Sequence, residues 1–89
     1  MEVREIIIKN QSGLQSKSAA VFIQKASSFK SDIWIEKEER KANGKSLLGL
    51  LSLGIGFGAR VIIIVDGEDE DRAANELESY LMTDVAGLL

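Results

Sequence analysis

The side chain in the most distinctive chemical setting is the hydroxyl of Ser46, which opens a short apolar run. Residues 47–53 contain five leucines, and Gly54 follows them. Serine is a preferred helix N-cap, because its hydroxyl accepts a hydrogen bond from a backbone N–H two or three residues further on. Glycine commonly occupies the position just after a helix. The sequence therefore predicts a helix of about two turns between Ser46 and Gly54.

The leucines of this predicted helix fall on two faces. Leu50 and Leu53 share one face, whereas Leu47, Leu48 and Leu51 share another. A single helix on a small protein can bury only one of these faces. We therefore expect the second group to form an exposed apolar patch at the start of the helix, and such a patch is typical of a docking site for a partner protein.

The composition excludes several kinds of catalysis. The chain contains no histidine and no cysteine, which rules out a Ser-His-Asp or Cys-His arrangement, a disulfide and the commonest metal ligands. No separated pair of carboxylates suggests acid–base catalysis. The acids of residues 68–71 fit a solvated helix start, where carboxylates complement the helix dipole. We expect no catalytic site, no metal and no cofactor.

Two glycine-containing stretches match nucleotide-binding motifs only in part. Gly44-Lys45-Ser46 has the ending of a P-loop, but that motif requires a glycine five residues before Gly44, where this chain has Glu39. Residues 54–58 do not match G-x-G-x-x-G. They also lie between a predicted helix and a predicted strand, which is the reverse of the dinucleotide-binding order. We interpret these glycines as turn and helix-end residues.

Length and charge limit the remaining classes. Eighty-nine residues make a single domain, residues 1–89, with room for one core. The net charge is −3, which argues against direct binding of nucleic acid. The longest continuous apolar run, residues 61–65, is far too short to span a membrane, and the first residues show no signal-peptide pattern. We expect a soluble, cytoplasmic protein with no membrane partner.

Hydrophobic patterning predicts strands and helices in the order β-α-β-β-α-β-α. The strand at residues 59–65 is almost uniformly apolar, which favours a central position in the sheet. Trp34 points away from Ile33 and Ile35, where it either packs on the sheet or forms a surface anchor. This order builds an α+β fold, an open-faced β-sandwich with a four-stranded antiparallel sheet and three helices on one face. The predicted strands are residues 3–9, 32–36, 40–43 and 59–65, with a solvated hairpin connection at 37–40; the predicted helices run from residue 16 or 18 to 28, from 46 to 54 and from 68 to a point before Gly87.

The stretch around Ser46 resembles the regulatory-serine segment of the HPr family, the histidine-containing phosphocarrier proteins of the bacterial sugar phosphotransferase system. Residues 45–55 carry the resemblance and read Lys-Ser-Leu-Leu-Gly-Leu-Leu-Ser-Leu-Gly-Ile. The predicted elements also follow the family order along essentially the whole chain. The resemblance implies an open-faced sandwich of HPr type and a regulatory phosphorylation site at Ser46.

The other motif of the family is altered in this chain. Residues 13–19 read Gly-Leu-Gln-Ser-Lys-Ser-Ala, where the family has glycine, an aliphatic residue, the phosphorylated histidine, alanine, arginine, proline and alanine. Gln15 stands in place of the phosphohistidine, and an amide has no nucleophilic nitrogen at neutral pH. Lys17 keeps the charge of the arginine but not its bidentate fork, and Ser18 replaces the proline that opens the helix. We expect no phosphocarrier activity.

Glutamine in place of the histidine is the hallmark of the Crh type, the catabolite-repression HPr-like proteins of low-GC Gram-positive bacteria. That type usually keeps the arginine and the proline, which this chain lacks. The resemblance implies a non-enzymatic regulatory protein that HPr kinase/phosphorylase modifies at Ser46 and that then acts as corepressor of a LacI-type catabolite control protein. A phosphate on Ser46 would lie close to Lys17 if the family fold holds. The implied partner-binding residues are Gln15, Lys17, Leu47, Leu48 and Leu51.

Alternative functions stay open at this point. A diverged HPr paralogue would dock on phosphotransferase-system enzymes through its apolar patch without phosphorylation, and a residual phosphocarrier role is the third candidate. In a purely structural interpretation, Ser46 is only a helix cap and the leucines belong to the core. The residues do not fix the oligomeric state, and a homodimer is compatible with them.

Overall fold

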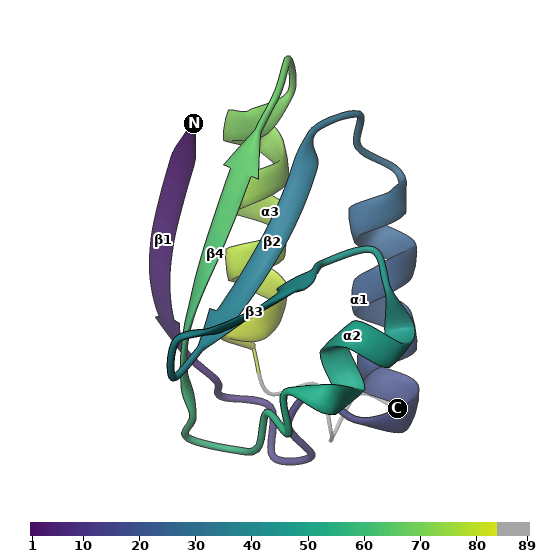
Figure 1. Ribbon diagram of the computed structural model, residues 1–89, viewed down its shortest axis with the longest axis vertical. Helices are drawn as coiled ribbons and strands as arrows, with labels where there is room; N and C mark the ends of the chain where they lie inside the picture. Colours follow the sequence, from purple (N-terminus) through teal and green to yellow (C-terminus); the bar gives the residue numbers. More distant parts are fainter. Residues whose placement is uncertain (84–89) are drawn as a thin grey trace.

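The computed structural model describes residues 1–83 and contains one sheet with three helices (Figure 1). The order of the elements confirms the order predicted from hydrophobic patterning. Gly87, which was expected after the last helix, lies outside the described residues. Within residues 1–83, no helix is long and apolar enough to cross a lipid bilayer. The elements are β1 (Glu2–Ile7), α1 (Ser16–Ser27), β2 (Asp32–Lys37), β3 (Arg40–Asn43), α2 (Leu47–Ser52), β4 (Arg60–Asp66) and α3 (Glu70–Leu81).

The four strands form one antiparallel sheet in the order β1-β4-β2-β3. β4 lies between β1 and β2, which confirms the central position predicted from its apolar run. The register aligns Ile64 of β4 with Val3 on one side and with Trp34 on the other. Successive side chains of a strand point to opposite faces, so these three residues share one face of the sheet.

The other face of the sheet carries the hydrophobic core, and α1, α2 and α3 pack against it. In α3, Ala74, Leu77 and Leu81 share one face of the helix and are buried. In α1, Ala19, Phe22 and Ala26 are buried, whereas Ile23 is only partly buried. The largest completely buried side chains are Phe22, Ile6, Ile8, Leu14, Ile33, Ile35, Leu50, Ile55, Ile63, Leu77 and Leu81.

The connection between β2 and β3 is tighter than predicted. We expected a solvated link over residues 37–40, but only Glu38 and Glu39 lie between the two strands. Their φ angles are 51° and 69°, which places both residues in the left-handed region. A two-residue hairpin turn favours this conformation because it matches the twist of the strands, although residues other than glycine adopt it at some cost.

Asp69 ties the start of α3 to the connection between α1 and β2. Its carboxylate accepts hydrogen bonds from the backbone N–H groups of Lys30 at 2.9 Å and Ser31 at 3.0 Å, and from the Ser31 hydroxyl at 2.5 Å. These hydrogen bonds lower the pKa of Asp69 to about 2, and the one from the Ser31 hydroxyl has the largest effect on it. The ionised carboxylate therefore stabilises the folded state.

Replacing Asp69 with asparagine should lower the melting temperature by several degrees at neutral pH. Because the folded-state pKa is depressed, the contribution of the carboxylate is complete above its unfolded pKa of about 4 and is lost as the pH falls towards 2. Thermal unfolding followed by circular dichroism should show a difference between wild type and Asp69→Asn that narrows below about pH 4. Glu68→Gln, at an exposed neighbouring carboxylate, is the matched control. A difference that stayed constant down to the lowest pH would contradict this assignment.

Candidate functional site: the surface of α1 and α2

Ser46 is the N-cap of α2, as the sequence predicts. Its backbone is extended, and its Oγ accepts a hydrogen bond from the N–H of Gly49 at 3.2 Å. The preceding turn holds it in place through Asn43, whose side-chain oxygen accepts from the N–H of Lys45 at 2.8 Å and whose carbonyl accepts from the N–H of Ser46 at 3.0 Å. Ser46 is partly exposed. Its hydroxyl therefore lies at the surface in a fixed position.

The leucines of α2 divide between core and surface as predicted. Leu50 and Leu53 are 0% and 4% exposed, whereas Leu47, Leu48 and Leu51 are 43%, 80% and 40% exposed. We call the three exposed side chains the leucine patch. The interpretation in which all of these leucines belong to the core is therefore wrong, because α2 packs on the sheet with one face and presents the other to solvent (Figure 1).

Two cations from the β2–β3 hairpin hold the end of α2. Lys37 Nζ donates to the carbonyl of the C-cap residue Leu53 at 3.3 Å and to that of Gly54, just beyond the helix, at 2.8 Å. A guanidinium N–H of Arg40 donates to the carbonyl of Ser52 at 2.8 Å. The carbonyls in the last turn of a helix lack partners within the helix and carry its negative partial charge, so cations stabilise them. Both hydrogen bonds lie at the surface, so the predicted solvated connection at residues 37–40 also contacts the end of α2.

Gln15 is the N-cap residue of α1, and its side chain is exposed. Its backbone N–H donates to the hydroxyl oxygen of Ser18 at 3.1 Å, and that hydroxyl lies 2.5 Å from the carbonyl oxygen of Gly13. Ser16, between them, has a φ of 50°. The buried Ser18 hydroxyl therefore organises the first turn at the place where the family has proline. Lys17 is exposed in the same turn.

α1 and α2 lie side by side and run in opposite directions (Figure 1). At one end, the N–H of Leu14 donates to the carbonyl of Ile55 at 2.9 Å; at the other end, Lys45 Nζ donates to the carbonyl of Phe29 at 2.8 Å. Gly13 permits the first contact, because a Cβ at this position would lie only 2.5 Å from the Ile55 carbonyl oxygen. The second contact brings the residue before Ser46 to the end of α1, whereas Lys17 lies in the first turn of that helix. A close approach of Lys17 to a phosphate on Ser46 stays a prediction.

A shallow, mostly apolar groove runs along the exposed side of α1. Sequence reasoning named only Lys17 among its residues and missed Ala20 and Val21. Both are apolar residues of α1 that do not share the face of the buried Phe22 and Ala26, and an apolar residue in such a position is the sequence signal that could have identified them. The groove is lined by Lys17, Ala20, Val21, Ile23, Gln24 and Ser27.

Positive and negative charges separate along the chain. Residues 6–31 and 40–65, which include α1 and α2, contain eight of the eleven lysines and arginines and none of the fourteen aspartates and glutamates. The acids concentrate in β1, in the β2–β3 hairpin and in α3. The unmodified surface of α1 and α2 is therefore apolar with positive charge around it, which fits an acidic partner surface.

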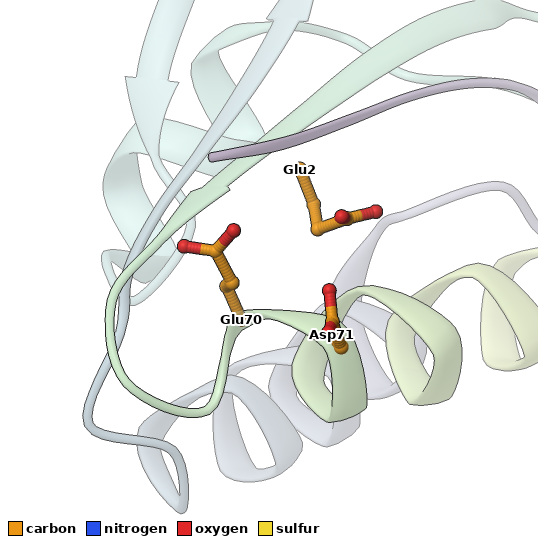
Figure 2. A group of neighbouring side chains, drawn as sticks. All are labelled: Glu2, Glu70 and Asp71. Carbon is orange, nitrogen blue, oxygen red and sulfur yellow. The ribbon is translucent and has the colours of Figure 1, made fainter.

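Three carboxylates meet where β1 approaches the start of α3, each with an oxygen within 4.8 Å of the others. Figure 2 shows Glu2 of β1 across from Glu70 and Asp71 of α3. Arg4 donates to Glu2 at 2.8 Å, and this contact holds the pKa of Glu2 below its usual value. Contact with Glu2 raises the pKa of Asp71. Glu70 accepts a hydrogen bond from the Met1 ammonium at 2.6 Å. The cluster is thus already compensated by cations, and it links β1 to α3.

Comparisons with known proteins agree with this fold. The sequence model of the family described as "PTS HPr component phosphorylation site" matches residues 3–83. The HPr-like protein Crh of Bacillus subtilis (strain 168) is 39% identical over 85 residues, which cover 96% of this chain and 100% of that protein. The chain therefore belongs to the HPr family.

Solved structures of the family share the fold. HPr from Thermoanaerobacter tengcongensis matches with a TM-score of 0.89 and 42% identity, over 91% of each chain. The crystal structure of Bacillus subtilis Crh matches with a TM-score of 0.73 and 40% identity, over 91% of this chain and 93% of that one. That structure is described as an intertwined dimer with a swapped domain. The α+β fold with three helices on a four-stranded antiparallel sheet is thus the HPr fold, as expected.

Truncating leucines of α2 should separate their structural and surface roles. Leu50→Ala should lower the free energy of unfolding by about 2–5 kcal/mol, because it leaves a cavity in the core. Leu48→Ala should change it by less than about 0.5 kcal/mol, because that side chain is mostly in solvent. Urea unfolding of both variants measures the difference. Equal losses of stability would contradict the division of α2 into a buried and an exposed face.

Proposed function

We propose that this chain is a non-enzymatic regulatory protein of carbon catabolite repression and the phosphotransferase system, switched by phosphorylation of Ser46. HPr kinase/phosphorylase would modify the serine, and the phosphorylated form would bind a LacI-type catabolite control repressor as corepressor. The observation that carries the proposal is the setting of Ser46, a partly exposed hydroxyl at the start of the helix that presents the leucine patch. The Crh relative supports the same regulatory class.

A phosphate on Ser46 would change the kind of partner that the surface prefers. The unmodified region carries only positive charges. A phosphoserine adds roughly −1.5 to −2 charges beside the leucine patch. Arginine binds phosphate with paired, charge-assisted hydrogen bonds. The modified surface therefore favours a partner that combines arginines with an apolar groove.

The modification is compatible with the fold. The first N–H groups of a helix and its positive dipole end favour an anion, so a phosphate at the N-cap should not unwind α2. Leu50 and Leu53, together with the cations of the β2–β3 hairpin, hold the rest of the helix independently of the Ser46 hydroxyl. Phosphorylation thus changes the surface while the core stays the same.

The start of α1 supports regulation over phosphate transfer. Gln15 has an exposed side-chain amide where the family has its phosphorylated histidine. An amide has no nucleophilic nitrogen at neutral pH, so Gln15 does not accept a phosphoryl group. Lys17 lacks the guanidinium fork that holds a phosphate in two places. We assign Gln15 and Lys17 to partner contact, alongside the leucine patch.

A second function, docking on phosphotransferase-system enzymes without phosphorylation, has its own support. The unmodified surface of α1 and α2 is apolar and positively charged, which suits an acidic partner as it stands. In this alternative Ser46 is only a helix cap. A homodimer is a further candidate assembly, because the Crh structure is described as a dimer.

Incubation with HPr kinase/phosphorylase and ATP, followed by peptide mass spectrometry, tests the proposal. We expect one phosphate on Ser46 in wild type and none in Ser46→Ala, which should remain folded because losing the cap costs only about 1 kcal/mol. Ser52→Ala is the matched control, since Ser52 is an exposed serine of the same helix and should not affect the reaction. No phosphate on wild type, with HPr as a working substrate, would overturn the switch and leave the docking alternative.

A further inference from the structure

The face of the sheet opposite the helices, which we call the open face, carries an apolar row. The register aligns Val3 of β1, Ile64 of β4 and Trp34 of β2, and the row ends at Asn43 of β3. Val3 is 57% exposed and Trp34 is 38% exposed, whereas Ile64 is partly buried. Figure 1 shows the three helices on the other side of the sheet. The row is therefore an exposed apolar band that runs across the strands.

On one side of the apolar row, two aspartates face each other across β4 and β2. The register pairs Asp66 with Asp32, two residues along the strands from the apolar row and on the same face. Like charges directly opposite one another destabilise a sheet. The Met1 ammonium lies 3.8 Å from Asp66, whose side chain is nevertheless 61% exposed, and Asp32 forms no ion pair within residues 1–83. The pair therefore leaves unbalanced negative charge beside the apolar row.

On the other side of the apolar row, two glutamates flank an isoleucine. The register places Glu5 and Glu36 on either side of the partly buried Ile62, two residues from the apolar row. Lys41 ends this second row at the edge of the sheet, and its ammonium lies 5.8 Å from the centre of the Trp34 ring. Neither glutamate forms an ion pair within the described part of the chain. This second row is therefore acidic except at its end.

The strands bring four carboxylates and two cations to the open face. The cations are Lys41 at one edge and Arg60, which pairs with Ile7 beyond the second acidic row. Lys37 and Arg40 belong to the helix side, where they bind the end of α2. The open face is therefore negative on both sides of an apolar row, and its charge is opposite to that of the α1 and α2 surface.

We propose that the open face binds a basic amphipathic helix of a partner protein, which lies along the apolar row. Residues two apart on a strand are about 6.6 Å apart, so the two acidic rows are about 13 Å apart with the apolar row midway between them. An α-helix with its side chains is about 10–12 Å wide, so basic residues on both of its flanks reach the acids. Neighbouring strands are about 4.8 Å apart, so the row is about 14 Å long and matches about ten residues of helix.

The chemistry of the face selects this partner. The apolar row takes the apolar stripe of the helix, and lysine or arginine on its flanks balances the carboxylates, including the two aspartates that repel each other. An extended strand displays the side chains of one face in a single line, so it could not reach both acidic rows at once. An anionic lipid surface would be repelled. The footprint is small, so the complex is weak and transient.

A designed peptide tests the proposal on the full chain. The probe is a helical peptide of about 14 residues, with leucines in one stripe, lysines on both flanks of that stripe and no aromatic residue. Trp34 is the only tryptophan of the chain, so its fluorescence reports on the apolar row. We expect its emission to shift to shorter wavelength as the peptide is added. A peptide with glutamate in place of each lysine, and one with the same residues shuffled so that no stripe remains, are the controls and should not bind.

Charge reversal on the chain locates the site. Asp32→Lys and Glu36→Lys should each weaken peptide binding about tenfold in calorimetry, because each removes a carboxylate from one acidic row and adds a repelling cation. Glu76→Lys, at an exposed acid of α3, changes the net charge equally and is the matched control that should bind as wild type does. Ser46→Ala should also bind as wild type does, because the open face lies on the side of the sheet opposite α2.

Other outcomes would overturn the proposal. Wild type that does not bind the lysine peptide at millimolar concentration would show that the open face is not such a site. Equal binding of the shuffled peptide, or an equal loss of binding in Glu76→Lys, would reduce the effect to non-specific attraction between opposite charges. A shift of the Trp34 emission on raising the protein concentration alone would assign the face to a second copy. Circular dichroism of each variant establishes that the fold is intact.

Discussion

The fixed position of α2 is the constraint on which the rest of the functional surface depends. An isolated helix of six residues, the length of α2, is unstable in water. Its few backbone hydrogen bonds do not offset the conformational entropy that is lost when the first turn forms. Here Leu50 and Leu53 anchor it in the core, Ser46 caps its start, and two cations hold its last carbonyls. The exposed leucines are consequently presented in one conformation, which lowers the entropy that a partner would otherwise have to remove on binding.

Much of the fold could be predicted from the sequence because the burial pattern is regular. The uniform apolar run of β4 indicated its central place, and the spacing of the leucines in α2 indicated which of them are buried. A hairpin connection at residues 37–40 was predicted, but its two-residue turn at Glu38 and Glu39 was not, because such turns are usually signalled by glycine, asparagine or aspartate. Here the pairing of the strands imposes a conformation that the two turn residues do not themselves favour.

The candidate site was predictable only where it depends on local chemistry. The cap at Ser46 follows from a serine before an apolar run, and Gly44 before it is required because a Cβ there would lie 2.5 Å from a methyl carbon of Ile33. The contacts of Lys37 and Arg40 with α2 join segments that are distant in sequence, so no local sequence pattern predicts them. The concentration of positive charge around α1 and α2 is visible in the sequence, but its meaning depends on knowing that the two helices share a surface.

The binding affinity of a LacI-type catabolite control repressor for the two forms of the protein tests the central claim most directly. Isothermal titration calorimetry with the phosphorylated and unmodified chains should detect binding only for the form that carries a phosphate on Ser46. Leu48→Asp, phosphorylated to the same extent, should lose this binding because it puts a carboxylate in the leucine patch. Equal affinity for both forms of wild type would contradict the account and favour docking that does not depend on phosphorylation.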